Sequence, residues 1–310
     1  MRLKPWGFTL AELLVATAIA GIAATAMTAT IVRQQKFYSA ASEILTTRSQ
    51  LRDGADVLAS DIRGASVELF GLPVMTDTAI EMFTVVGTSV ACDLPAGTSI
   101  GLPPASLVSG NTLTSLLYQP DTGDLALIHV IPSGVIDSAE WQTYRIAAFG
   151  SRALNVACAS TTGFTTPGDA FAGATAFQLT LTTAASPAVR SGAAIHFVRR
   201  ARYSFYRSSD GEWYLGYRRC SATAPFPCAS IQPVSGPYRP YRAGSPPGLT
   251  FRYFDAGGVQ LTTPAESFRV ARVDIVLRGE SVNAVALTGD SRKVWRDSIL
   301  VTVSPRNRAH

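Results

Sequence analysis

The chain has 310 residues, 47% of them hydrophobic and 16% charged, which suffices for one large domain or two modest ones. Its 27 Lys and Arg residues only slightly outnumber its 22 Asp and Glu residues, an excess too small to indicate nucleic-acid or anionic-lipid binding by itself. Eighteen prolines and 25 glycines disfavour a helical bundle and favour a turn-rich β domain.

The N-terminus combines a basic leader with a long apolar segment. Residues 1–7 read MRLKPWG and carry two positive side chains and a proline, which discourages helix. The 25 residues from Phe8 to Val32 contain a single charge, Glu12. With a rise of about 1.5 Å per residue, this segment is long enough to cross a hydrocarbon core of about 30 Å. It predicts a signal peptide or a transmembrane anchor.

Glu12 is the informative residue of this segment. A carboxylate inside an apolar span is costly and usually has a functional partner. The sequence has no Lys, Arg or His between Gly7 and Arg33. Cleavage after Gly7 would create a cationic α-amine on Phe8, four residues from Glu12. That amine, from the same chain or from an axially staggered neighbour, is the partner that we expect.

The nine residues from Gly7 to Val15, GFTLAELLV, resemble the type III signal sequence of type IV pilins and pseudopilins. The resemblance implies that a prepilin peptidase cuts after Gly7 on the cytoplasmic side and N-methylates Phe8. It also implies that Glu12, the fifth residue after the cut, acts in filament assembly. The alternative is an ordinary secretory signal that ends at the small residues 24–26, although Glu12 would then interrupt its apolar core.

An amphipathic helix is predicted after the apolar segment. Its apolar stripe recurs at spacings of three, four or seven and comprises Phe37, Ala41, Ile44, Leu51, Ala55, Leu58 and Ile62. The whole helix should run from Phe8 to Arg63 and end near Gly64, with Gly54 as a weak point that costs up to about 1 kcal/mol. The segment 51–63 also resembles, more loosely, W-type minor pilins and J-type minor pseudopilins.

Beyond residue 66 the sequence predicts short strands. Alternation is clean at 177–181, 271–278 and 299–303, and less regular at 80–86, 113–119, 125–131 and 143–149. Two hairpins are predicted, 194–207 with 212–219 and 249–255 with 259–262. Stretches rich in Ser, Pro and Gly at 95–111, 159–175 and 221–247 are predicted loops.

The expected fold class is therefore α+β, with a long N-terminal helix packed on a mostly antiparallel β head. We expect a leader at 1–7, a transmembrane or filament-core helix at 8–32, an amphipathic stem at 33–65 and a periplasmic head at 66–310. This is also the architecture that the resemblance to pilins implies.

Four cysteines, Cys92, Cys158, Cys220 and Cys228, form no C-x-x-C pair and lie far in sequence from the three histidines, so neither a metal site nor a cofactor is predicted. An even number of cysteines after an export-type N-terminus indicates disulfides in an oxidising compartment. Of the three possible pairings we favour Cys220–Cys228, which closes a short loop with two prolines, and Cys92–Cys158 by elimination. Four buried thiols are the alternative.

The head carries none of the common catalytic or nucleotide-binding motifs, and no enzymatic activity is expected. Residues 199–207, RRARYSFYR, have a composition that suits single-stranded DNA, but in a hairpin they more often form a solvated face with aromatic cross-strand pairs. Three acidic residues at helical spacing, Asp53, Asp56 and Asp61, fit a solvated or stem-facing role.

The resemblance implies a minor pilin or minor pseudopilin, in a type IV pilus or a type II secretion pseudopilus. Its head is larger than a repeating shaft subunit needs, which favours a tip or priming role. Segments 268–277 and 306–308 also resemble W-type minor pilins. The implied partners are prepilin peptidase, other subunits through the N-terminal helix, and the inner membrane, with nucleic acid not expected. The implied location is a single-pass inner-membrane protein with a periplasmic head, later drawn into a filament. Two alternatives are a secreted soluble enzyme or binding domain and a DNA-binding pilin.

Overall fold

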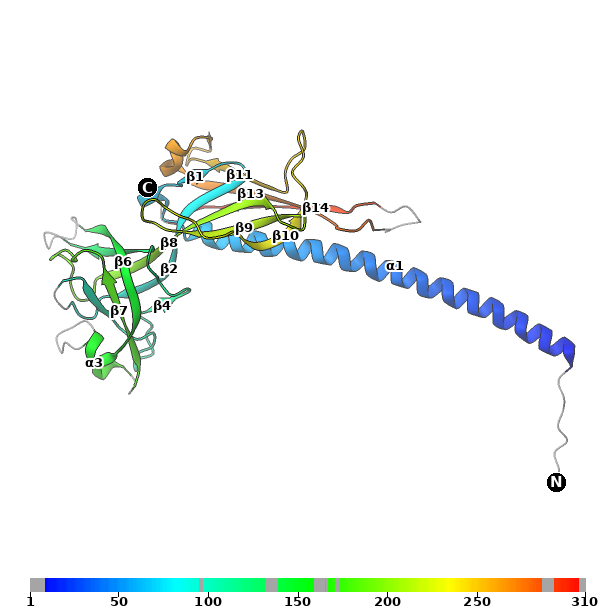
Figure 1. The fold of residues 1–310 in the computed structure, drawn as a ribbon, viewed down its shortest axis with the longest axis horizontal. Helices are drawn as coiled ribbons and strands as arrows, with labels where there is room; N and C mark the ends of the chain where they lie inside the picture. Colours follow the sequence, from blue (N-terminus) through cyan, green and yellow to red (C-terminus); the bar gives the residue numbers. More distant parts are fainter. Residues whose placement is uncertain are drawn as a thin grey trace, which may run out of the picture.

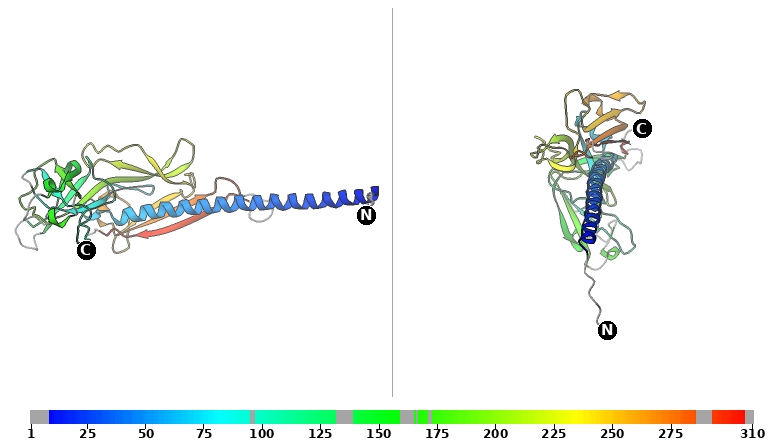
Figure 2. Two further views of the ribbon diagram at one scale, coloured as in Figure 1. Left: turned by 90° about the horizontal axis from the view of Figure 1, so that it is seen from below. Right: turned by 90° about the vertical axis from the view of Figure 1, so that its right-hand side faces the viewer.

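The computed structural model describes residues 9–94, 97–131, 139–158, 165, 167–170, 173–285 and 293–306. It has an α+β fold in which one long helix, α1 (Leu10–Arg63), projects from a β-rich head. The C-terminal part of α1 lies against the head, and its N-terminal part extends away as a free rod (Figures 1 and 2).

The head contains short helices and two antiparallel sheets. In chain order its elements are α2 (Val67–Phe70), β1 (Val74–Met75), β2 (Ala79–Val90), β3 (Ser99–Leu102), β4 (Ser115–Leu116), β5 (Leu125–Val130), β6 (Glu140–Ala153), α3 (Leu154–Ala157), η2 (Pro167–Asp169), β7 (Thr175–Leu181), β8 (Ala194–Arg207), β9 (Trp213–Cys220), β10 (Gln232–Tyr238), β11 (Leu249–Phe254), β12 (Gln260–Leu261), η3 (Pro264–Arg269), β13 (Arg272–Glu280) and β14 (Arg296–Val303).

One sheet has ten strands and the other has four. The main path of the large sheet is β1-β2-β8-β5-β6-β7-β3, with β9 and then β10 joined to β8, and β4 joined to β2. The small sheet has the order β12-β11-β13-β14. The two long strands of this sheet, β2 and β8, pair from Ala79↔Ser204 to Val90↔Ala194.

Because β2 and β8 are long, each contributes to two hydrophobic cores. Their ends nearer the helix, with Ile80, Met82 and Tyr203, pack with α1 and strands β9 to β14, and we call this part the stem lobe. Their other ends, with Val86 and Phe197, pack with β3 and β5 to β7, and we call this part the distal lobe. The distal lobe is the green part at the lower left of Figure 1.

The stem helix follows the sequence prediction closely at its C-terminus. It ends at Arg63, and the Gly64 amide donates to the Ser60 carbonyl at 3.2 Å. Its buried face comprises Ala40, Thr47, Leu51, Gly54, Ala55, Leu58, Ala59 and Ile62. Phe37 was expected in that stripe, and this prediction is wrong: the head covers the helix only from Ala40 onwards, so the Phe37 side chain is 67% exposed.

Gly54 lies where α1 closely approaches β10. A Cβ atom at this position would overlap the Tyr238 hydroxyl of β10. The hydroxyl oxygens of Ser235 and Tyr238 lie 2.5 and 3.0 Å from the Gln50 carbonyl oxygen of α1. Gly54 therefore has a packing role that its place in the helical pattern did not indicate.

Most predicted strands are confirmed, including both hairpins. Hairpin β8–β9 has the register Arg207↔Trp213 across the turn, and hairpin β11–β12 has Phe254↔Gln260. Three predictions are wrong. The segment 113–119 contributes only the two-residue strand β4, and the expected loops 95–111 and 221–247 contain β3 and β10. Nine of the 17 residues of the expected loop 159–175 lie outside the described residues.

Candidate functional site: the bare apolar half of the long helix

The candidate site is the N-terminal part of α1 from Leu10 to Val32, which none of the described parts of the head covers. Every described residue from Thr9 to Ser39 is exposed. Large apolar side chains such as Leu10, Ile22 and Met27 are 80%, 71% and 67% exposed. Such a continuous apolar surface is unfavourable in water and indicates contact with lipid or with other helices. By length and composition α1 is able to cross a membrane, although a signal sequence passes the same test.

Glu12 lies in the first turn of this helix and forms part of its N-terminal cap. Its Oε2 accepts hydrogen bonds from the Thr9 amide at 2.9 Å and from the Thr9 hydroxyl at 3.0 Å. The Thr9 hydroxyl oxygen in turn accepts from the Glu12 amide at 3.3 Å, which completes a capping box. With the leader still attached, Glu12 therefore satisfies two donors at the helix N-terminus.

The predicted cleavage junction lies just before this cap. Gly7 and Phe8 are outside the described residues, so the expected pairing of Glu12 with a new amine on Phe8 stays a prediction. Removal of residues 1–7 would leave Thr9 as the second residue of the mature chain. The capping box and the new amine would then compete for the same carboxylate.

Small residues line the exposed rod. Seven alanines and glycines lie between positions 16 and 26, and the Cβ position of Gly21 has no heavy atom within 4 Å. Small side chains allow neighbouring helices to approach closely in a membrane. The rod is thus suited to helix–helix packing as well as to lipid.

The stem is fixed to the head by polar contacts as well as by its buried face. Arg48 of α1 pairs with Asp297 of β14 at 3.0 Å, and the Asn283 side-chain amide donates to Glu43 at 2.7 Å. Near the end of the helix, the Tyr203 hydroxyl donates to Asp61 at 2.6 Å. Burial raises the pKa of Asp61 above its usual value, and the hydrogen bond from Tyr203 lowers it in part.

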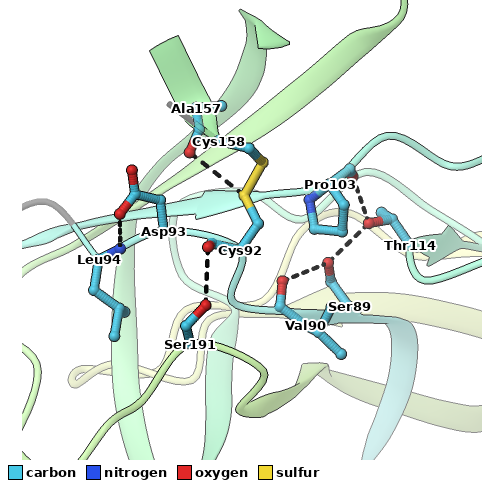
Figure 3. Close-up of a disulfide and its surroundings, with 10 residues drawn as sticks. All are labelled: Ser89, Val90, Cys92, Asp93, Leu94, Pro103, Thr114, Ala157, Cys158 and Ser191. Carbon is cyan, nitrogen blue, oxygen red and sulfur yellow. Dashed lines mark hydrogen bonds between the residues drawn. A yellow bond between two sulfur atoms is a disulfide. The ribbon is translucent and has the colours of Figure 1, made fainter. Parts of the chain in front are cut away.

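The four cysteines form two disulfides, Cys92–Cys158 and Cys220–Cys228, the pairing favoured from the sequence. The first is fully buried in the distal lobe and joins the end of β2 to α3 (Figure 3). Beside it, the Ser191 hydroxyl donates to the Cys92 carbonyl at 3.0 Å. The second closes the loop after β9, and its sulfurs lie near the Glu81 carboxylate. That grouping is not a metal site, because both thiols are consumed in the disulfide and Glu81 pairs with Arg200.

The basic and aromatic stretch in β8 is used inside the head. Arg199 is 8% exposed and binds Asp124 through an Nη2–Oδ2 contact of 2.7 Å. Arg200 pairs with Glu81 and lies over the Phe226 ring, with the guanidinium carbon 4.6 Å from the ring centroid. Arg202 is partly exposed. Arg199 and Arg200, two of the arginines in this stretch, therefore already have internal partners.

The two described histidines lie against the same aromatic ring. His129 and His196 both pack against Trp141, at centroid distances of 5.2 and 4.5 Å, and burial lowers the pKa of His196. His310 lies outside the described residues. Among the helical acidic residues, Asp61 faces the sheet, and Asp53 and Asp56 are exposed.

Comparisons with known protein families, with curated proteins and with solved structures find no match to this chain.

Proposed function

We propose that the chain is a minor pilin or minor pseudopilin, a non-enzymatic subunit that prepilin peptidase processes and that assembles through its N-terminal helix. The observation that carries the proposal is the bare rod from Leu10 to Val32, an exposed apolar helix whose single charge, Glu12, lies in its first turn. A rod of this kind is suited first to the membrane and then to packing among like helices.

In this proposal the head faces the periplasm while the chain waits in the inner membrane. Two disulfides in the head are consistent with an oxidising compartment. The head has two lobes, more than a repeating shaft subunit needs, which supports a position at the filament tip or in priming. Both a type IV pilus and a type II secretion pseudopilus accommodate such a subunit.

The mature N-terminus tests the proposal directly. The full-length chain is purified from cells with and without prepilin peptidase, and the N-terminal peptide is measured by mass spectrometry. We expect N-methylated Phe8 as the first residue in cells that have the enzyme, and Met1 in cells that lack it. A chain beginning at Met27 in both strains would instead establish a secreted domain with an ordinary signal peptide.

Substitutions of Glu12 test the assembly step separately from the cleavage step. We expect Glu12→Ala to be processed normally but to enter filaments poorly. Glu12→Gln is the matched variant, because its amide oxygen still accepts the capping hydrogen bonds but carries no charge. If charge pairing with the Phe8 amine drives assembly, Glu12→Gln fails like Glu12→Ala; normal incorporation of Glu12→Gln would contradict the charge-pairing account.

A DNA-binding pilin is the weaker alternative, since Arg199 and Arg200 are engaged inside the head. That alternative would be favoured if the intact chain retained DNA and if this retention were lost both at high salt and in Arg202→Ala.

A further inference from the structure

A pocket of about 350 Å³ lies in the stem lobe at the adjoining ends of β13 and β14. It is lined by Arg239, Arg278, Gly279, Arg296, Asp297 and Ser298. These residues come from three segments that are distant in the sequence. Gly279 approaches Thr47 and Leu51 of α1, which places the pocket beside the middle of the stem.

Two of the arginines, Arg239 and Arg278, are held by neutral acceptors. Arg239 Nη2 donates to the Ser245 hydroxyl oxygen at 2.6 Å, and Arg278 Nη1 donates to the Pro247 carbonyl at 2.9 Å and to Thr250 Oγ1 at 3.0 Å. Within the described part of the chain, no carboxylate lies within ion-pair distance of either guanidinium. Neutral acceptors therefore hold both groups in place, and no carboxylate of the described residues neutralises their charge.

The nearby carboxylates are already paired with other cations. Asp297 binds Arg48 at 3.0 Å, and Glu280 binds Arg296 at 2.9 Å and lies 3.9 Å from Arg242. The pocket consequently has an excess of positive charge. Burial, together with the neighbouring Arg239 and Arg252 cations, lowers the pKa of Arg278, which is the direction expected for a crowded group of like charges.

We propose that Arg239 and Arg278 form a binding site for an oxyanion, a carboxylate or phosphate group of a soluble ligand. Guanidinium groups held in fixed orientations donate paired hydrogen bonds to the two or three oxygens of such a group. An entering anion also relieves the repulsion among the cations. This inference does not depend on the proposed pilin function.

A lipid headgroup is disfavoured as the source of the anion. The apolar segment ends at Val32, and Thr47 lies fifteen residues further along α1. At about 1.5 Å per residue the pocket is about 22 Å beyond the end of the span, whereas the headgroup layer extends only about 5–8 Å beyond the hydrocarbon core.

The test is isothermal titration calorimetry on the full-length chain in uncharged detergent micelles at low salt. Inorganic phosphate and citrate are the probes, and the tighter of the two identifies the preferred oxyanion. We expect a Kd below about 1 mM for at least one probe, weakened about tenfold or more by Arg239→Gln, the loss expected from one charge-assisted hydrogen bond.

Arg145→Gln is the matched control, since Arg145 is an exposed arginine on β6 in the distal lobe. It makes the same change in net charge and should bind like the unaltered chain. Arg278→Gln by itself should weaken binding more than Arg239→Gln does. If circular dichroism shows that Arg278→Gln does not fold, Arg239→Gln alone decides the test. Absence of binding by the unaltered chain, or equal weakening by Arg145→Gln and Arg239→Gln, would overturn the proposal.

Discussion

The buried ion pair Arg199–Asp124 gives the sharpest prediction on stability. Asp124 is fully buried, and its carboxylate accepts from Arg199 Nε at 3.1 and 3.2 Å and from Nη2 at 2.7 Å. Replacing Arg199 with glutamine removes these charge-assisted bonds and leaves a buried carboxylate without its main partner. Arg219 Nη2, 3.4 Å away, compensates only in part.

Loss of one partner of a buried pair costs about 3–5 kcal/mol, and the remaining contact with Arg219 places Arg199→Gln near the lower limit. The control is Arg48→Gln, which breaks a pair of similar length, 3.0 Å, whose side chains are 54% and 34% exposed. Since water solvates and screens that pair, its loss should cost at most about 1 kcal/mol.

The assay is urea unfolding of the full-length chain in micelles, followed by tryptophan fluorescence. Trp141 packs beside Val198, next to Arg199 in sequence, so it reports on this region. Equal losses of unfolding free energy in the two variants would refute the reasoning, because they would show that burial does not govern the cost of losing these pairs.

Three further predictions follow from the stem and the disulfides. Gly54→Ala should destabilise the chain by about 1–3 kcal/mol through overlap with the Tyr238 hydroxyl, and adding Tyr238→Phe should recover part of this loss in the same urea assay. The pKa of Asp61 in the folded chain is raised above 3.8, so around these pH values the folded state binds more protons at Asp61 than the unfolded state does. The contribution of Asp61 to the free energy of unfolding therefore falls as the pH rises through that raised pKa. On raising the pH from 4 to 7, the unaltered chain should lose this part of its stability and Asp61→Asn should not, so the difference in unfolding free energy should shift in favour of Asp61→Asn. A difference that does not change with pH would contradict this. Finally, a disulfide that closes a longer loop should stabilise the chain more, because it removes more entropy from the unfolded state. Replacing both cysteines of Cys92–Cys158, separated by 66 positions, should cost about 4 kcal/mol, and replacing those of Cys220–Cys228, separated by 8, about 2.5 kcal/mol. Thermal unfolding of the two variants measures the order, and the reverse order would contradict this reasoning.

The features predicted best from the sequence are those with a strong local period. The stem helix and hairpin β8–β9 follow from spacing and turn residues alone. Strand β10 was missed because Pro233, Gly236 and Pro237 give it the composition of a loop. It is an edge strand with two irregularities in its register, and such strands tolerate proline because one side needs no hydrogen-bond donors.

Features that depend on distant contacts left no local signal. The exposure of Phe37 depends on where the head begins to cover α1, and the role of Gly54 depends on Tyr238. The arginine-lined pocket joins residues 239, 278 and 296 from separate segments, so no motif marks it. The bare rod and its single acid, by contrast, were predictable, because a membrane-length apolar run is itself a local pattern.

Some partners of the stem helix lie at the opposite end of the polypeptide. Residues 47 and 51 of α1 touch Gly279 of β13, and the Arg306 amide donates to the Arg63 carbonyl at 3.1 Å. Such pairs enclose more than two hundred intervening residues, so their formation carries a large loop-closure cost and is slow. During synthesis the apolar stripe of the stem therefore stays only partly covered until the last strands emerge, and a nascent chain stopped before β13 and β14 leaves the part around Thr47 and Leu51 open to chaperones and proteases.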